Sequence, residues 1–377
     1  MHLAKTMSAY IARQFLAWFG AVFGAMVSVT FLLDYIELIR RSGTRAQATW
    51  GILLEMAALK LPHTAQDVMP FAILFGTILV FWRLTRSNEL VVARAAGVSV
   101  WGFLTPAILV ALVLGILAVT LFNPIASAMQ ASYEKLDTRI LRMGGDPLSL
   151  SNAGLWLRQS DGAGGQIIIH GDKAISPDLS LRPDISLRPD LLLRNVSVFF
   201  LDRGSRFAAR IEARSARLEG GFWVIGDGQR FRPGEPPESI GELRLPTSLT
   251  ASKIQESLAS PDTMSFWELP GFIALLEQSG FSTQRHRLHF NVLLARPLLF
   301  CAMVLVAATF SLRMQRRGGA VMLLVSGVAT GFLLYFLSDV VFALGLSAKI
   351  PVVLAAWTPA GVSLIFGISM LLHLEDG

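Results

Sequence analysis

Residues 98–122 read VSVWGFLTPAILVALVLGILAVTLF and contain no Asp, Glu, Lys or Arg. A helix needs about 20 apolar residues to cross the roughly 30 Å hydrocarbon core of a bilayer, so this stretch predicts a transmembrane helix. Five other windows of the chain meet the same criterion. The six predicted spans are Gln14–Leu33, Pro62–Trp82, Val98–Phe122, Val292–Leu312, Ala320–Phe342 and Val352–Leu372.

The composition agrees with a membrane protein. Of the 377 residues, 53% are hydrophobic and 16% are charged, and the mean hydropathy is +0.54; soluble domains carry about 25% charged residues. The net charge is +6, but no basic run interleaved with aromatic residues predicts nucleic-acid binding. Cys301 is the single cysteine, which excludes a disulfide within the chain and a cysteine-based metal site.

An even number of spans puts both termini on one side of the membrane. The short loops on that side carry eight basic residues, namely Lys5, Arg13, Arg83, Arg86, Arg94, Arg313, Arg316 and Arg317. The short loops on the other side carry five, namely Arg40, Arg41, Arg45, Lys60 and Lys349. The positive-inside rule therefore favours cytoplasmic termini. The difference between the two counts becomes smaller if Arg285, Arg287 and Arg296 near the fourth span are added to the second side. The first apolar run is too long for a signal peptide and lacks a cleavage site.

Between the third and fourth spans the hydrophobic period changes to that of β-strands. Short β-rich runs at 154–158, 166–170, 195–200, 206–213 and 221–225 are separated by Gly, Asp, Pro and Asn, which predicts an antiparallel β-sandwich or jelly roll. We therefore expect a membrane α-helical fold with an inserted antiparallel β-jelly-roll domain. The predicted boundaries are 1–133 for the first three spans, 134–287 for the β-domain and 288–377 for the last three spans. The pentapeptide Ser-Leu-Arg-Pro-Asp at 180–184 recurs at 186–190 and is interpreted as a duplicated loop.

The segment between the second and third spans predicts a short helix near 87–96. Ser87 is expected to cap its start, Glu89 to lie in the first turn and Gly97 to end it. Leu90 and Val91 give the helix apolar surface. It is either an interfacial helix on lipid headgroups or a docking helix for a cytosolic partner.

Four stretches of the chain resemble a known family. They are Asp34–Gly43 after the first span, Pro70 with Ser87–Gly97, Gly154–Leu157, and the run from Arg287-Leu-His-Phe through Pro297-Leu to Phe310–Gly319. Their order and spacing resemble the LptF/LptG permease family of the lipopolysaccharide export ABC transporter, and more closely its LptG branch. The resemblance covers essentially the whole chain, and the duplicated pentapeptide departs from it.

The resemblance implies partners and a site for each. In the family, two permeases pair on a dimer of a separate ATPase, and a single-span periplasmic protein carries a similar jelly roll. The resemblance places Glu89, with Arg86 and Arg94, in the ATPase contact. The chain has no Gly-x-x-x-x-Gly-Lys-Ser/Thr loop, so we expect no cofactor in it and ATP bound by the partner. The resemblance also implies a bacterial inner membrane, cytoplasmic termini and a periplasmic β-domain.

Basic residues just outside the first span are the candidate cargo site. Arg40, Arg41 and Arg45 are either interfacial anchors with Asp34 and Glu37 as partners, or ligands for lipid A phosphates. The planar guanidinium suits paired bonds to phosphate, and the resemblance implies that role for Arg40 and Arg41.

Small and aromatic residues are candidates for cavity or gate lining. Gly20 with Gly24 and Gly327 with Gly331 form Gly-x-x-x-Gly pairs, which permit close helix approach in lipid but also arise by chance. The resemblance implies that the first and fifth spans line lateral gates. The other candidates for the cavity or gate are Met69, Phe332, Phe336 and Asp339.

Asp339 and Arg296 are charges within predicted spans, where a charge is costly. Each either reaches headgroups or faces the interior. His63 and Asp67 are too few ligands for a zinc site, so no metal is expected.

Two functions of different classes remain. The first is a permease subunit that extracts lipopolysaccharide and passes it to a periplasmic bridge. The alternative is a membrane-anchored periplasmic enzyme that modifies envelope lipids or glycans. That enzyme would need a nucleophile and base or a carboxylate pair in the β-domain, and no such motif is found there. A structural scaffold for envelope assembly is a third possibility.

Overall fold

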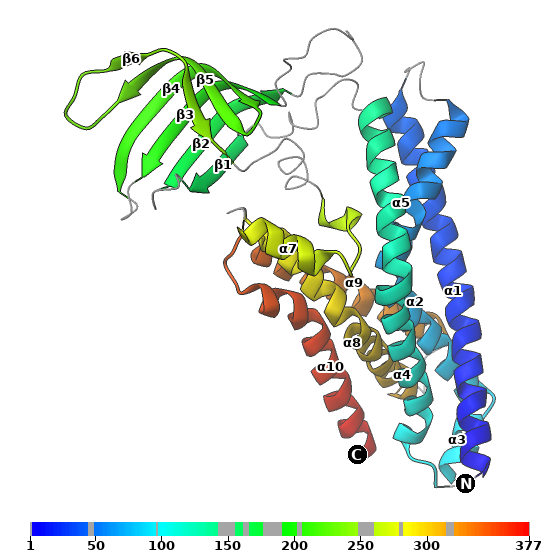
Figure 1. Ribbon diagram of the computed structural model, residues 1–377. Helices are drawn as coiled ribbons and strands as arrows, with labels where there is room; N and C mark the ends of the chain where they lie inside the picture. The colour runs from blue at the N-terminus through cyan, green and yellow to red at the C-terminus, as the bar shows by residue number, and fades with distance from the viewer. Residues whose placement is uncertain are drawn as a thin grey trace. The chain divides into compact units, whose positions relative to one another are not determined.

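The computed structural model describes residues 2–43, 49–95, 97–141, 155–160, 166–175, 191–201, 206–247, 260–278, 282–313 and 320–376 (Figure 1). The chain divides into two compact units. One comprises Met1–Leu136, Pro261–Pro270 and Gln284–Gly377, and the other comprises Asp137–Ser260 and Gly271–Thr283. The first is a helical bundle and the second is built around a β-sheet.

Six helical segments of the described chain are long and apolar enough to cross a membrane, which confirms the predicted number of spans. The third segment is composite. It runs from α4 (Val100–Leu117) through the π-helix η1 (Ala118–Phe122), α5 (Asn123–Leu136) and the π-helix η2 (Asp137–Leu141). The others are α1 (His2–Ser42), α2 (Trp50–Arg86), α8 (Gln284–Arg313), α9 (Ala320–Leu346) and α10 (Val352–Asp376).

Local chemistry supports these helices in an apolar setting. Ser99 caps α4 by accepting a hydrogen bond on its hydroxyl from the backbone N–H of Gly102 at 3.3 Å. Two fully buried hydroxyls are satisfied within their own helices, since Thr77 donates to the Ile73 carbonyl and Ser363 to the Pro359 carbonyl. These bonds matter in a lipid-embedded helix, because no water is present there to pair with a polar group.

Helix α8 lies at the centre of the bundle core. The core cluster joins its buried Phe300 and Val304–Ala308 to side chains of α1, α2, α4, α9 and α10. Glycines on neighbouring helices permit the close packing. A Cβ on Gly115 of α4 would lie 2.5 Å from the Cα of Pro297, and one on Gly367 of α10 would lie 2.7 Å from Leu305 Cβ.

The segment before α8 is fastened to the composite third span. The backbone N–H of Phe266 donates to Asn123 Oδ1 at 2.8 Å, and Trp267 Nε1–H donates to the Thr120 carbonyl of η1 at 3.1 Å. A π-helix changes the backbone hydrogen-bonding pattern within an α-helix. In η1, the Thr120 carbonyl accepts a hydrogen bond from the Trp267 indole. Phe266 also stacks on Phe290 of α8 with ring centroids 5.3 Å apart. These contacts fix the start of α8 against the third span.

The β-unit is a single curved antiparallel sheet (Figure 1). Its strands are β1 (Leu155–Ser160), β2 (Gln166–Ile175), β3 (Leu191–Leu201), β4 (Phe207–Glu219), β5 (Phe222–Phe231), β6 (Glu238–Ile240) and β7 (Leu243–Pro246). Strands β1 to β6 follow one another in sheet order, and β6 and β7 pair with different parts of β5. Alternate residues such as Ile167, Ile169, Val196, Val198 and Trp223 form the buried core of the unit.

The prediction of an antiparallel β-region between the third and fourth spans is confirmed. Strands β1 to β5 coincide with the five predicted runs, whereas β6, β7 and α7 (Leu269–Gln278) were not predicted. Strands of three and four residues are too short to show alternation. The duplicated pentapeptide lies outside the described residues, and the predicted domain boundaries stay predictions.

Candidate functional sites

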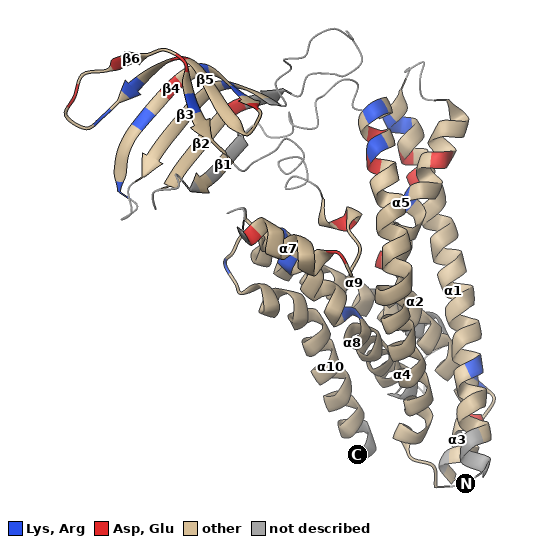
Figure 2. Ribbon diagram, in the orientation of Figure 1, with Lys and Arg blue, Asp and Glu red and all other residues tan. Residues whose placement is uncertain are grey.

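Charged residues of the bundle gather at the helix ends (Figure 2). Figure 2 shows blue and red residues at the ends of α1, α2 and α5 that lie opposite the chain termini, whereas the middle part of α1 is tan. We call this the distal end of the bundle. The candidate cargo residues lie there.

Arg40 lies on the last turn of α1 and is strongly exposed. Its side chain is 77% exposed and forms a paired interaction with Glu37 one turn earlier. Arg40 Nε donates to Glu37 Oε2 at 2.8 Å and Nη2 to Oε1 at 3.0 Å. Arg41 follows and is also exposed, and Arg45 lies outside the described residues. The structure therefore shows a guanidinium already bonded to a carboxylate at the surface.

Of the two predicted carboxylate partners, Glu37 binds Arg40, whereas Asp34 binds the neighbouring helix. Its carboxylate binds α2 instead, since Lys60 Nζ lies 2.6 Å from Asp34 Oδ1 and Thr64 Oγ1 donates to Oδ2 at 3.1 Å. Asp34 lies six residues before Arg40 and is largely buried between α1 and α2. The sequence reading missed this cross-helix pair because Lys60 had been counted only as a loop charge.

The two Gly-x-x-x-Gly pairs have different surroundings. No atom of the described residues outside their own helix would meet a Cβ on Gly20 or Gly24. A Cβ on Gly327 would lie 2.5 Å from Ile78 Cδ1 and one on Gly331 would lie 3.2 Å from Phe71 Cδ1. The α9 pair thus packs against α2 of the same chain, while the α1 pair is open. A contact of either pair with another subunit stays a prediction.

The aromatic candidates of α9 face outward. Phe332 and Phe336 are among the most exposed apolar residues of the described chain. Met69 of α2 is partly buried and packs against the bundle core. Phe332 and Phe336 are therefore exposed, whereas Met69 lies inside the bundle, as the packed glycines of α9 do.

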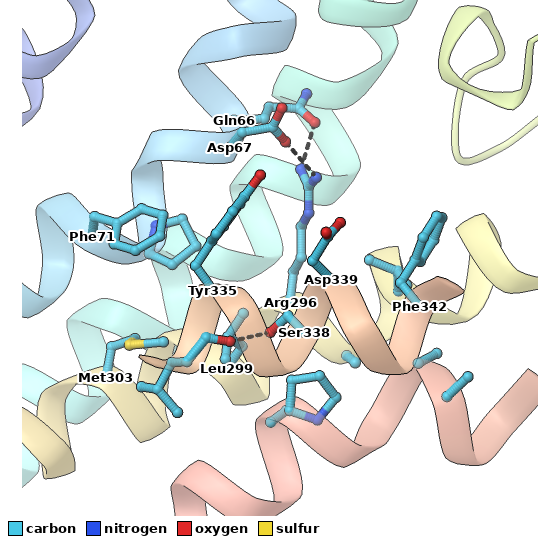
Figure 3. Close-up of a pocket in the computed structure, with 18 residues that line it drawn as sticks. Gln66, Asp67, Phe71, Arg296, Leu299, Met303, Tyr335, Ser338, Asp339 and Phe342 are labelled. Carbon is cyan, nitrogen blue, oxygen red and sulfur yellow. Dashed lines mark hydrogen bonds and ion pairs between the residues drawn. The ribbon is translucent and has the colours of Figure 1, made fainter. Parts of the chain in front are cut away.

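A cavity of about 360 Å³ lies between α2, α8, α9 and α10 (Figure 3). Arg296 and Asp339, the two charges predicted within spans, both line it. Arg296 faces the interior, where Nη1 donates to Gln66 Oε1 at 2.6 Å and Nη2 lies 3.4 Å from Asp67 Oδ1. The sequence reading missed Gln66, because an uncharged polar residue in an apolar helix gives no sign of what it faces.

The predicted docking helix exists as α3 (Glu89–Ala95). Gly97 has φ +82°, and the Val98 N–H bonds the Ala93 carbonyl at 3.1 Å, which is the glycine-dependent helix stop that was predicted. The capping role of Ser87 was predicted wrongly. Its hydroxyl and N–H both bond the Arg83 carbonyl at the end of α2, and the hydroxyl also lies 2.8 Å from Glu89 Oε1.

The structure describes the side chains of two of the three residues predicted to contact the ATPase. Glu89 is exposed and also borders a small pocket of about 90 Å³ with Tyr10, Leu84 and Phe103. The guanidinium carbon of Arg86 lies 5.5 Å from the Trp82 ring centroid. The side chain of Arg94 lies outside the described residues.

Among the described residues, no group of three or more His, Cys, Asp or Glu side chains has the arrangement of a metal site.

Comparison with known proteins explains this combination of six spans and one β-insert. The family described as lipopolysaccharide export system permease LptF/LptG matches residues 9–373. The chain belongs to this family. The LptG protein of Escherichia coli strain K12 is 21% identical over 97% of each chain. The LptG protein of Haemophilus influenzae is 23% identical over 95% of this chain and 96% of its own length.

Membership of the LptF/LptG family establishes the general role. The chain is a multi-pass inner-membrane transport permease of the lipopolysaccharide export system. The resemblance stated from its sequence is confirmed, including its closeness to LptG. The individual residue roles are not decided by family membership and stay predictions.

Proposed function

We propose that this permease extracts lipopolysaccharide from the inner membrane and passes it to a periplasmic bridge, driven by a separate ATPase. The observation that carries the proposal is the family match from residue 9 to residue 373, which includes all six spans and the β-unit. In this proposal the termini are cytoplasmic and the β-unit is periplasmic. The distal end of the bundle then lies at the periplasmic surface.

Arg40 and Arg41 are proposed to bind the phosphates of the cargo, with Arg45 beside them. The exposure of Arg40 supports this, since a phosphate can reach it without opening the bundle. Both carboxylate oxygens of Glu37 accept hydrogen bonds from the Arg40 guanidinium. A phosphate would compete with Glu37 for the same donors, because both accept paired bonds from a guanidinium.

The cargo's acyl chains need an apolar surface, and α1 and α9 supply one. Exposed apolar side chains on these helices include Leu32, Leu33 and Ile36 of α1 and Phe332 and Phe336 of α9. A second, LptF-type permease is proposed to pair with this chain along these faces. Gly20 and Gly24 would permit close approach of the partner there.

The ATPase dimer is proposed to contact α3 through Glu89, with Arg86 and Arg94 beside it. The exposed position of Glu89 at the start of α3 supports this. ATP binding in the partner would favour a closed cavity that binds lipid less well, which is a population shift. The β-unit would pass lipid to the jelly roll of a single-span periplasmic protein.

The proposal is tested first by what accompanies the chain. We expect purification from its native membrane in mild detergent to yield an ATPase, a second six-span permease and bound lipopolysaccharide, identified by mass spectrometry. A chain that arrives without an ATPase, or with enzymes of a lipid-modifying pathway, would refute the proposed transporter and favour the enzyme alternative.

Reversing the charge of the candidate phosphate ligands tests the cargo site. We expect the double variant Arg40→Glu, Arg41→Glu to lower photocross-linking of lipopolysaccharide strongly, because repulsion replaces charge-assisted bonds. Subunit assembly should be unchanged. Arg13→Glu is the control, since it reverses one positive charge at the opposite end of α1, where the side chain is exposed. The single variants Arg40→Glu and Arg41→Glu make the same charge change as this control. Equal cross-linking in the double variant and Arg13→Glu would remove Arg40 and Arg41 from the site.

A further inference from the structure

The segment that precedes α7 lies between two helices of the bundle. We call residues 260–268 the strap. One side of the strap binds α8, because Asp262 Oδ1 lies 3.2 Å from His289 Nδ1 and the Phe266 ring stacks on the Phe290 ring. The other side binds the third span at η1. The strap therefore joins α8, which is largely buried in the bundle, to the third span.

The third span has a carbonyl without an α-helical donor at η1. In an α-helix each backbone N–H bonds the carbonyl four residues earlier, so the Thr120 carbonyl would accept from residue 124. That residue is Pro124, which has no N–H. The Thr120 hydroxyl is engaged elsewhere, since it donates to the Ile116 carbonyl at 2.8 Å. The sequence thus leaves an acceptor open at the junction of α4 and α5.

The strap supplies the missing donor. The Trp267 indole N–H donates to the Thr120 carbonyl at 3.1 Å, and the Phe266 backbone N–H donates to Asn123 Oδ1 at 2.8 Å. Phe266 lies in the turn that leads into α7, and backbone N–H groups at the start of a helix have no partner within it. The donors of the strap and the acceptors of the third span therefore satisfy each other.

These two bonds also tie together two connections of the chain. The bundle part of the chain ends at Leu136, at the end of α5, and returns at Pro261, in the strap. The connection that leaves the bundle is thereby fastened to the one that first returns to it. Trp267 is 63% exposed, so its bond can open without unpacking the core of the bundle.

We propose that the strap is a latch that keeps α5 in line with α4, in which Trp267 supplies the donor that Pro124 lacks. Helices bend most often at proline and at π-helical turns, and η1 and Pro124 place both at one junction. With the latch closed, α5 continues α4 in one column (Figure 1).

Opening of the latch has a defined consequence. Helix α5 would tilt at the junction, while α4 stays held by the close approach of Gly115 to Pro297 of α8. Trp267 is thus a positioning residue that acts through the Thr120 carbonyl. This role is independent of the cargo and of the ATPase proposed above.

The test measures the alignment of α4 and α5 by pulsed electron paramagnetic resonance. Spin labels are placed at the exposed positions Leu109→Cys in α4 and Ser132→Cys in α5. The full-length chain carries Cys301→Ser and is reconstituted in nanodiscs with the subunits that accompany it. The labels are 23 positions apart, or about 35 Å at the rise of an α-helix. We expect one narrow distance distribution.

The variant Trp267→Phe removes the indole donor and keeps an aromatic ring. We expect it to broaden the distribution and to shift its mean to shorter distances, because a straight helix separates the labels most. Pro124→Ala supplies a backbone N–H for the Thr120 carbonyl, so Trp267→Phe should have no effect in that background. Trp50→Phe, at a tryptophan that is 69% exposed, is the matched control and should change nothing.

The variant Asn123→Ala tests the second bond without changing Trp267. We expect it to broaden the distribution also, and Pro124→Ala should not reverse this, because the lost acceptor belongs to the Phe266 N–H. An unchanged distribution in Trp267→Phe would overturn the proposal. So would equal broadening by Trp267→Phe with and without Pro124→Ala, which would show that the indole does not act by replacing the missing donor.

Discussion

Helices α1 and α8 have nearly the same hydropathy and opposite surroundings. The most apolar windows of the two have mean hydropathies of 2.0 and 2.2, yet 6% of the α1 window is buried within the chain and 67% of the α8 window. Helix α8 packs against α2, α4, α9 and α10, whereas α1 packs chiefly along α2. Hydropathy thus measures suitability for a membrane and says little about whether the neighbour is lipid or protein.

The difference has a functional meaning in a permease. Because lipid tails are as apolar as leucine, association of helices in a bilayer depends on close packing and polar contacts. Helix α8 has both, through Pro297 beside Gly115 and through Arg296. Helix α1 has polar contacts to α2 near its two ends, at Gln14 and at Asp34, and a close approach of Phe19 to Gly76 between them. The rest of α1 is available to lipid or to another subunit.

The largest effect is expected from a side chain added where α4 meets α8. Gly115→Val would place its Cβ 2.5 Å from the backbone Cα of Pro297, so two helix backbones would have to separate. We expect a loss of about 3 kcal/mol or more, at the upper end for overpacked sites, measured as a large fall in Tm in detergent. The matched variant on α1, Gly24→Val, meets no atom and should leave Tm nearly unchanged. An equal fall in both variants would break the comparison.

The next effect concerns the buried guanidinium of α8. Arg296→Gln removes the hydrogen bond from the guanidinium to Gln66, so the buried Gln66 Oε1 loses its donor. We expect a loss of about 2 kcal/mol, within the range for a buried unsatisfied group, measured by thermal unfolding. Arg285→Gln makes the same change on the same helix at an exposed position and should have little effect. If Arg285→Gln destabilises as much, the role assigned to the Gln66 contact is wrong.

The smallest effect is expected from the ion pair that joins α1 to α2. Lys60→Met breaks the ion pair with Asp34, whose side chain is 16% exposed. We expect a loss of about 1 kcal/mol, between the values for surface and buried pairs, measured by the same unfolding assay. Glu37→Gln breaks the exposed pair with Arg40 and should leave Tm unchanged, because exposed pairs are screened by solvent. A larger fall with Glu37→Gln would show that the end of α1 is more constrained than its exposure indicates.

Much of the fold could be predicted because its signals are local. A run such as residues 98–122 needs no partner to be recognised as a span, and the alternation in 166–170 and 195–200 is visible in the sequence itself. The sequence reading missed β6, β7 and α7, which are short segments with weak periodicity. It also misassigned Ser87, because a residue between two helices can close the first or cap the second.

The candidate sites were less predictable because their geometry is not local. The bond between Arg296 and Gln66 joins residues 230 positions apart in the chain, and no periodicity of either helix indicates it. Lys60 and Asp34 are 26 positions apart. Their ion pair engages the Asp34 carboxylate, which the sequence had suggested as a partner of Arg40. The two glycine pairs look alike in sequence and differ only in what lies opposite them.

The sequence by itself determined that this protein has six membrane-crossing helices and a β-domain between the third and fourth, since apolar length and strand alternation are properties of short segments. It also carried the resemblance to the LptF/LptG family. Only the tertiary structure decided which helix is buried, which charge faces inward and where a cavity remains. These depend on which surfaces meet, and in a bilayer an apolar side chain suits a lipid and a neighbouring helix equally well.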